Sequence, residues 1–163
     1  MTDPATNLQV IRRSRHRPER GEVFVMKLAS GDFLFGRVVL AEPPRQEAPM
    51  PSAYLIYVYN VRRAESTIDW AELRPERLLI PPVWINRMPW TKGYFEAIGS
   101  GELDASDLLS QHCFRDWTGT HRDEKGRGLP GPAEPCGDWG LSSYRWLDDH
   151  ISDALGVPRA PSP

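Results

Sequence analysis

Residues 21–40 read GEVFVMKLASGDFLFGRVVL and decide the fold of the chain. Val23–Leu28 and Phe33–Leu40 are rich in β-branched and aromatic residues, so both segments are predicted to be strands. The short polar corner between them includes Gly31, which can take a positive φ, and it predicts a tight turn. Gly36 interrupts the second segment, where a glycine indicates a bulge or a close approach of another group. The stretch therefore predicts an antiparallel hairpin that begins a curled sheet.

A third strand is expected at residues 53–60, which are apolar on both faces, as in the centre of a sheet. The clearest helix lies near the end of the chain, where Ser142 or Ser143 is the expected cap and Gly156 ends it. Its apolar positions recur at helical spacing and must cover one face of the sheet. Further strands are predicted at residues 78–86, 94–98 and 112–116, and short helical turns at 67–74 and 103–109.

These elements predict an α+β fold that is mostly β. The expected architecture is a curved antiparallel sheet of about five or six strands with a C-terminal α-helix packed on it. An SH3-like partial barrel is one form that such a sheet takes.

The 163 residues of the chain are enough for one domain with a substantial core. Residues 1–20 are predicted to be a basic, flexible leader, residues 21–157 a single β-rich domain, and residues 158–163 a flexible tail. Within the domain, residues 117–140 are mostly polar and rich in glycine and proline. A connection of this length inside a compact domain is typically functional or mobile.

The amino-acid composition of the chain limits the functional classes to which it can belong. Apolar residues make up 40% and charged residues 26%, which is ordinary for a globular domain. The net charge of −2 argues against a protein whose main task is to grip nucleic acid. No segment resembles a signal peptide or a transmembrane helix. The only cysteines, Cys113 and Cys136, predict no disulfide framework, and two dispersed thiols suit a reducing compartment, so a cytoplasmic location is expected.

Catalytic chemistry is not indicated. No nucleophile, base and oxyanion donor can be assembled from the sequence, so the chain is expected to be neither an enzyme nor dependent on a cofactor. The best metal-ligand candidates are His112, Cys113, His121 and Cys136. Their spacing fits no zinc template, and neighbours on a strand point to opposite faces. A buried thiol and surface histidines are the favoured interpretation, and no metal site is predicted.

Binding is the remaining function class. Trp117 and Trp139 bracket the long polar connection, and exposed aromatic residues beside polar segments often anchor protein interfaces. The sequence leaves open the alternative that both tryptophans pin the connection to the sheet. Acidic residues gather in the connection and on the C-terminal helix, where they are expected to face outward. The candidate partner-binding residues are Asp116, Trp117, Asp123, Glu124, Asp138, Trp139, Asp148 and Asp149.

Three segments of the sequence together resemble a known family. They are GEVFVMKL followed by GDFLFGRV in the first hairpin, LIPP from Leu79, and PWTKGYF from Pro89. With the helical ending at residues 144–155, this combination resembles the immunity-26 family of bacterial polymorphic-toxin systems. The resemblance implies a small, mostly β, cytoplasmic protein that neutralises a cognate toxin. It identifies neither the toxin nor any site residue.

Two functional hypotheses follow. The first is an immunity protein that occludes the active site or substrate path of a toxin acting in the cytoplasm, such as a nuclease or another enzyme. The acidic candidates would then complement a basic cleft of the toxin. The second is a small barrel that binds nucleic acid through the basic leader. The net charge disfavours this alternative, and a membrane is not an expected partner.

Overall fold

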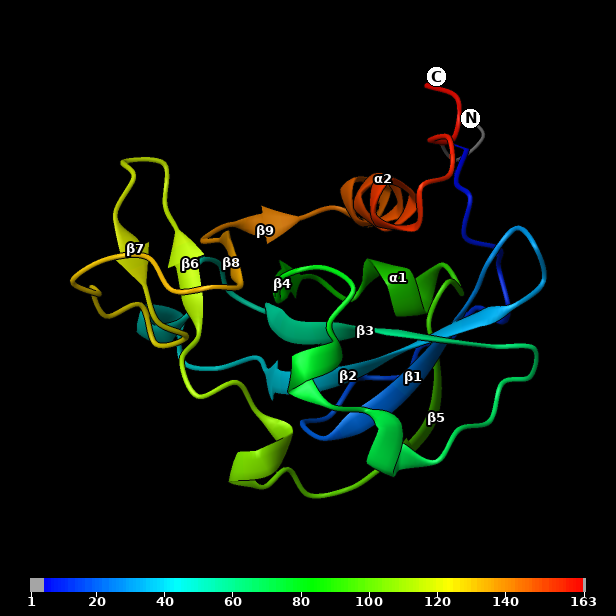
Figure 1. The fold of residues 1–163 in the computed structure, drawn as a ribbon, viewed down its shortest axis with the longest axis horizontal. Coiled ribbons are helices and arrows are strands. Elements are labelled where there is room, and N and C mark those ends of the chain that lie inside the picture. Colours follow the sequence, from blue (N-terminus) through cyan, green and yellow to red (C-terminus); the bar gives the residue numbers. More distant parts are fainter. Residues whose placement is uncertain (1–4, 163) are drawn as a thin grey trace.

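The computed structural model describes residues 5–162, which form two β-sheets flanked by short helices (Figure 1). The larger sheet has six strands in the order β5-β1-β2-β3-β4-β9, and the smaller has three in the order β7-β6-β8. The larger sheet curves but does not close into a barrel, and a C-terminal helix lies beside it. The predicted fold class is therefore confirmed.

The strands of the described chain are β1 (Glu22–Lys27), β2 (Phe33–Ala41), β3 (Tyr54–Arg63), β4 (Val83–Ile85), β5 (Glu96–Ser100), β6 (Cys113–Arg115), β7 (His121–Arg122), β8 (Cys136–Asp138) and β9 (Leu141–Ser142). The helices are α1 (Met88–Thr91) and α2 (Tyr144–Leu155), with 3₁₀ turns η1 (Arg45–Glu47), η2 (Trp70–Glu72), η3 (Pro75–Arg77) and η4 (Ala105–Asp107).

The first hairpin forms as its sequence predicts. β1 and β2 pair antiparallel, and Val25 lies opposite Phe35. Gly31 in the turn has a φ of 93°, which L-residues with side chains rarely adopt. At Gly36 the register between β2 and β3 shifts, and an added Cβ would lie 2.3 Å from the ring of Phe24. Both the bulge and the close approach expected at this glycine are present.

β3 is the central strand and separates two hydrophobic clusters. Tyr54, Ile56 and Val58 face the cluster that includes α1 and α2, whereas Tyr57 and Tyr59 face the cluster that includes β6. All five side chains are at most 1% exposed, so the three tyrosines belong to the core. The smaller sheet therefore covers one face of the larger sheet, and α2 covers the other.

One pair in the larger sheet departs from the antiparallel arrangement that the sequence predicted. β9 runs parallel to β4, so the larger sheet is mixed. A parallel pair needs a long crossover connection, and the chain between these two strands includes β5 and the whole smaller sheet. No sequence pattern indicated this pair because β9 is only two residues long.

The predicted long connection at residues 117–140 contains two strands. β7 pairs antiparallel with β6, and β8 pairs parallel with β6 on its other side. Residues 112–140 are called the β6–β8 lobe below; in Figure 1 the lobe lies to one side of the larger sheet.

Helix α2 begins and ends as predicted. The hydroxyl of Ser143 accepts the N–H of Trp146 at 3.1 Å, and Gly156 ends the helix with a φ of 71°. Leu147 and Ile151 are buried against the sheet, as the helical spacing of apolar positions requires. No helix in the described part of the chain is long and apolar enough to cross a membrane.

The division of the chain into leader, domain and tail stays a prediction, and the described start of the leader contacts the core. Leu8 is buried in the core with α2, and the Gln9 N–H donates to the Lys27 carbonyl at 2.9 Å. The described ends of the chain lie close together beside α2 (Figure 1). The arginines of the leader, from Arg12 to Arg20, are exposed.

Candidate functional site

Asp116 closes the turn that joins β6 to β7. Its Oδ1 accepts the N–H groups of Thr118 at 2.9 Å and Thr120 at 3.0 Å, and its Oδ2 accepts from Arg122 Nε at 2.9 Å. The Thr118 hydroxyl also donates to Oδ1, and this bond is the largest cause that lowers the pKa of Asp116 to about 2. The Asp116 residue is only 8% exposed. The Asp116 carboxylate therefore stabilises the turn and does not face solvent.

A second turn repeats this arrangement seven residues later. Asp123 Oδ1 accepts the N–H groups of Lys125 and Arg127, each at 2.9 Å, and Oδ2 accepts from Arg127 Nε at 3.0 Å. In both turns the amide of a glycine, Gly119 or Gly126, donates to the aspartate carbonyl at 3.0 Å. The repeated Asp-x-x-Gly spacing was the sequence signal that these two aspartates build turns.

The two candidate tryptophans lie in different environments. Trp117, directly after Asp116, is 95% exposed at the tip of the first turn. Trp139 is half-buried, with its ring centroid 5.7 Å from that of Trp84 and 6.0 Å from that of Phe114. Trp139 therefore pins the lobe to the larger sheet, whereas Trp117 projects from it.

Glu124 connects the lobe to the core through a buried histidine. Its Oε2 lies 3.3 Å from His112 Nδ1, and His112 Nε2 lies 2.7 Å from the Tyr57 hydroxyl. The Tyr57 hydroxyl also accepts the Leu109 N–H at 3.0 Å, so it joins His112 to the backbone that precedes β6. The bond from His112 is the largest cause that lowers the pKa of Glu124. No sequence motif indicated this contact between β3 and the lobe.

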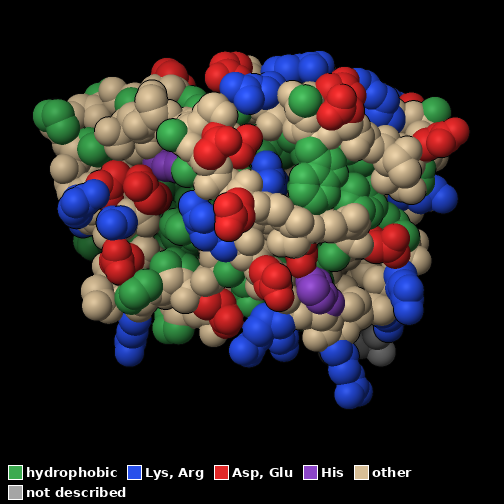
Figure 2. Space-filling view, turned by 90° about the horizontal axis from the view of Figure 1, so that it is seen from below, with side chains coloured by type: hydrophobic (Ala, Val, Ile, Leu, Met, Phe, Trp, Pro, Cys, Tyr) green, Lys and Arg blue, Asp and Glu red, His purple; other side chains and the backbone are tan. Residues whose placement is uncertain are grey.

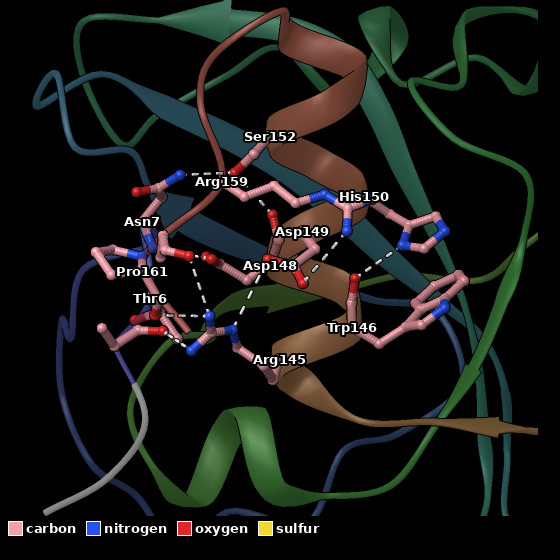
Figure 3. A network of polar contacts seen from close by, with 12 residues as sticks. Thr6, Asn7, Arg145, Trp146, Asp148, Asp149, His150, Ser152, Arg159 and Pro161 are labelled. Atoms are coloured by element: carbon pink, nitrogen blue, oxygen red, sulfur yellow. Dashed lines mark hydrogen bonds and ion pairs between the residues drawn. The ribbon is translucent and has the colours of Figure 1, made fainter. Parts of the chain in front are cut away.

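On α2, the expectation that Asp148 faces outward is wrong. The side chain is 1% exposed because residues 5–9 cover it. Its Oδ1 accepts the Leu8 N–H at 2.7 Å and its Oδ2 accepts the Asn7 N–H at 2.9 Å (Figure 3). Burial raises the pKa of Asp148 despite these bonds. The neighbouring Asp149 lies 3.7 Å from Arg145 Nε and 4.0 Å from Arg159, which belongs to the C-terminal segment.

The eight candidates thus fall into two groups. Six lie in the β6–β8 lobe, and Asp148 and Asp149 lie on α2 (Figure 1). Within the lobe, Trp117 and Asp138 are exposed, Glu124 and Trp139 are partly buried, and the two turn aspartates are buried. Figure 2 shows one face of the molecule on which acidic and basic side chains are interspersed, without a continuous patch of either sign.

The metal candidates do not form a cluster in residues 5–162. No group of three or more histidine, cysteine, aspartate or glutamate side chains in this range could hold a metal ion. His112 is committed to Tyr57 and Glu124, and the two cysteines lie beside each other instead.

Comparison with known proteins identifies a family. Residues 19–122 match a family described as Immunity protein 26, a range that includes the first hairpin, α1, β6 and Trp117. Neither a curated protein nor a solved structure matches the chain. The match ends before β8 and α2, so Asp116 and Trp117 are the only two of the eight candidates inside it.

Proposed function

The chain belongs to the immunity protein 26 family, and on that premise we propose that it binds a cognate bacterial toxin in the cytoplasm and neutralises it. The proposed mechanism is occlusion of the toxin's active site or of the path of its substrate. Such inhibition requires no catalysis by the immunity protein. It requires a stable fold, an exposed anchor and complementary charge.

The 95% exposure of Trp117 is the observation that favours the surface around it as the toxin interface. A side chain of this size left in water is the kind of residue that fills a pocket on a partner. The turn on which it stands is held by four hydrogen bonds to the Asp116 carboxylate, two from backbone N–H groups and two from the side chains of Thr118 and Arg122. Because the turn is already ordered, binding through Trp117 would cost little backbone conformational entropy.

Charge would add to this anchor. Asp138 is exposed at the end of β8, and Glu124 keeps part of its side chain in solvent. We propose that these carboxylates face a basic region of the toxin, as expected if the toxin is a nuclease or another enzyme with an anionic substrate. Asp116, Asp123 and Asp148 would support the interface by holding turns and the N-terminal segment.

A Trp117→Ala variant tests this surface. We expect it to bind the toxin about tenfold to a hundredfold more weakly, which is typical for loss of a central aromatic anchor. Its melting temperature should match the wild type because the ring makes no buried contact. The matched control is Val10→Ala, a 50% exposed side chain on the N-terminal segment, which should bind as the wild type does.

Calorimetry or surface plasmon resonance with the cognate toxin domain gives the affinities. Equal affinity of the Trp117→Ala variant and the wild type would place the interface elsewhere on the molecule. It would leave the family membership and the inhibition itself to be tested separately.

A further inference from the structure

Cys113 and Cys136 are far apart in the sequence but adjacent in space. They are register partners in the parallel pair β6–β8, so both side chains lie on the same face of the smaller sheet. Their Sγ atoms are 2.9 Å apart, and both thiols are free. The expectation of two dispersed thiols is therefore wrong, because sequence spacing contains no information on the pairing of β6 with β8.

We propose that Cys113 and Cys136 are an oxidative modification site that forms a reversible disulfide within the chain. Neighbouring strands lie about 4.8 Å apart, which is inside the range of roughly 4.4–6.8 Å between Cα atoms that a disulfide spans. A disulfide bond of about 2.05 Å would require the two sulfur atoms to approach by only about 0.9 Å. The backbone is thus already placed for the bond.

The oxidant that fits the site is a low-molecular-weight disulfide. Cys113 is fully buried, whereas Cys136 is partly exposed. Cys136 lines a pocket of about 170 Å³ between β8 and α2, together with Trp146 and His150. An external sulfur atom therefore reaches Cys136 first. Burial, followed by the hydrogen bond from Cys113, raises the pKa of the Cys136 thiol to about 12, so the thiol is protonated at neutral pH and reacts slowly.

The exchange has two balanced steps. Cys136 loses its proton to solvent and its sulfur attacks the small disulfide, which forms a mixed disulfide and releases one small thiolate. Cys113 then loses its proton and attacks Cys136 Sγ, which releases the second small thiolate. The two thiolates take up two protons. The protein dithiol has then lost two electrons, and the small disulfide has gained them.

The bond would close a loop that contains both aspartate turns and Trp117. Closing a loop of this length restricts the unfolded chain, and we expect the melting temperature to rise by about 5–10 °C on oxidation. Any effect on toxin binding through Trp117 rests on the proposed function. The modification itself does not.

Peptide mapping of the full chain tests the proposal. The protein is equilibrated in mixtures of reduced and oxidised glutathione, quenched with acid, alkylated and digested without reduction. We expect a cross-linked pair of peptides containing Cys113 and Cys136, which disappears when reduced glutathione is restored. Full alkylation of both cysteines in the most oxidising mixture, a persistent glutathione adduct, or a disulfide between two chains would overturn the proposal.

Two serine variants test the order of attack. Cys113→Ser should retain a stable glutathione adduct on Cys136 because the second sulfur is missing. Cys136→Ser should show no adduct because Cys113 is buried. The reverse pattern would contradict the assigned route. If Cys113→Ser does not fold, the cross-link in the wild type still decides whether the site exists.

Discussion

The backbone at Gly36 is so closely surrounded that no side chain fits there. A Cβ there would lie 2.3 Å from the Phe24 ring and 2.7 Å from the Tyr57 carbonyl oxygen. Phe24 stacks on Phe95 with ring centroids 4.2 Å apart, so the ring has little freedom to move. The glycine lets β1, β2 and β3 approach at the bulge that curves the larger sheet.

A Gly36→Ala variant should therefore be less stable by about 2–4 kcal/mol, because a buried ring or the β3 backbone must shift. Urea denaturation measures the change. The control is Gly131→Ala, where nothing lies within 4 Å of the added methyl group. A Gly36→Ala variant as stable as this control would show that the bulge relaxes freely.

The lowered pKa of Asp116 predicts how the stability of the fold depends on pH. Its pKa is lowered from 3.8 to about 2 in the folded state, first by the hydrogen bond from Thr118. A lowered pKa contributes stability above the unfolded value, and this contribution is lost as the pH falls through the folded value. The difference in urea midpoint between the wild type and Asp116→Asn should be largest near neutral pH and shrink between about pH 4 and pH 2. A difference independent of pH would contradict this assignment.

At the scale of elements, α2 fastens both described ends of the chain. Asp148 binds two backbone N–H groups of the N-terminal segment, and Arg145 donates to the carbonyls of Ala160 at 3.1 Å and Pro161 at 2.9 Å (Figure 3). The Asn7 side chain adds bonds to Ser152 at 2.8 Å and to the Pro158 carbonyl at 2.7 Å. The N-terminal segment therefore forms part of the cover on the α2 side.

An Asp148→Ala variant should release this segment, because two buried N–H groups lose their acceptors. We expect a loss of about 2–4 kcal/mol in the free energy of unfolding. Hydrogen exchange at Asn7 and Leu8 should accelerate, whereas Asp153→Ala, which removes an exposed ion pair to Arg159, should leave both amides protected. Unchanged protection in the Asp148 variant would mean that Leu8 packing alone holds the segment.

The sequence predicted elements whose signals are local. The hairpin turn at Gly31, the cap at Ser143 and the αL end at Gly156 each depend on a few neighbouring residues, and all are present. Contacts between distant segments could not be predicted this way. The burial of Asp148 depends on Leu8, which is 140 residues away, and the exposed Trp117 and packed Trp139 differ only through tertiary structure.

At the scale of the whole molecule, the larger sheet is covered on one face by α2 and on the other by the β6–β8 lobe. Trp139 and the Tyr57–His112–Glu124 contacts hold the lobe to the sheet, so Trp117 is presented from a rigid support. A rigid scaffold with one projecting aromatic side chain suits an inhibitor that binds a preformed pocket.

Co-expression tests whether this protein neutralises a toxin by binding it. Each open reading frame beside the gene is induced in bacteria with and without this protein, and each candidate pair is purified through a tag on one of the two proteins. We expect growth to be restored and a stoichiometric complex of nanomolar affinity to be recovered. Continued toxicity with no complex, at equal levels of folded protein, would contradict the claim; salt-sensitive retention of RNA or DNA would instead point to the basic leader.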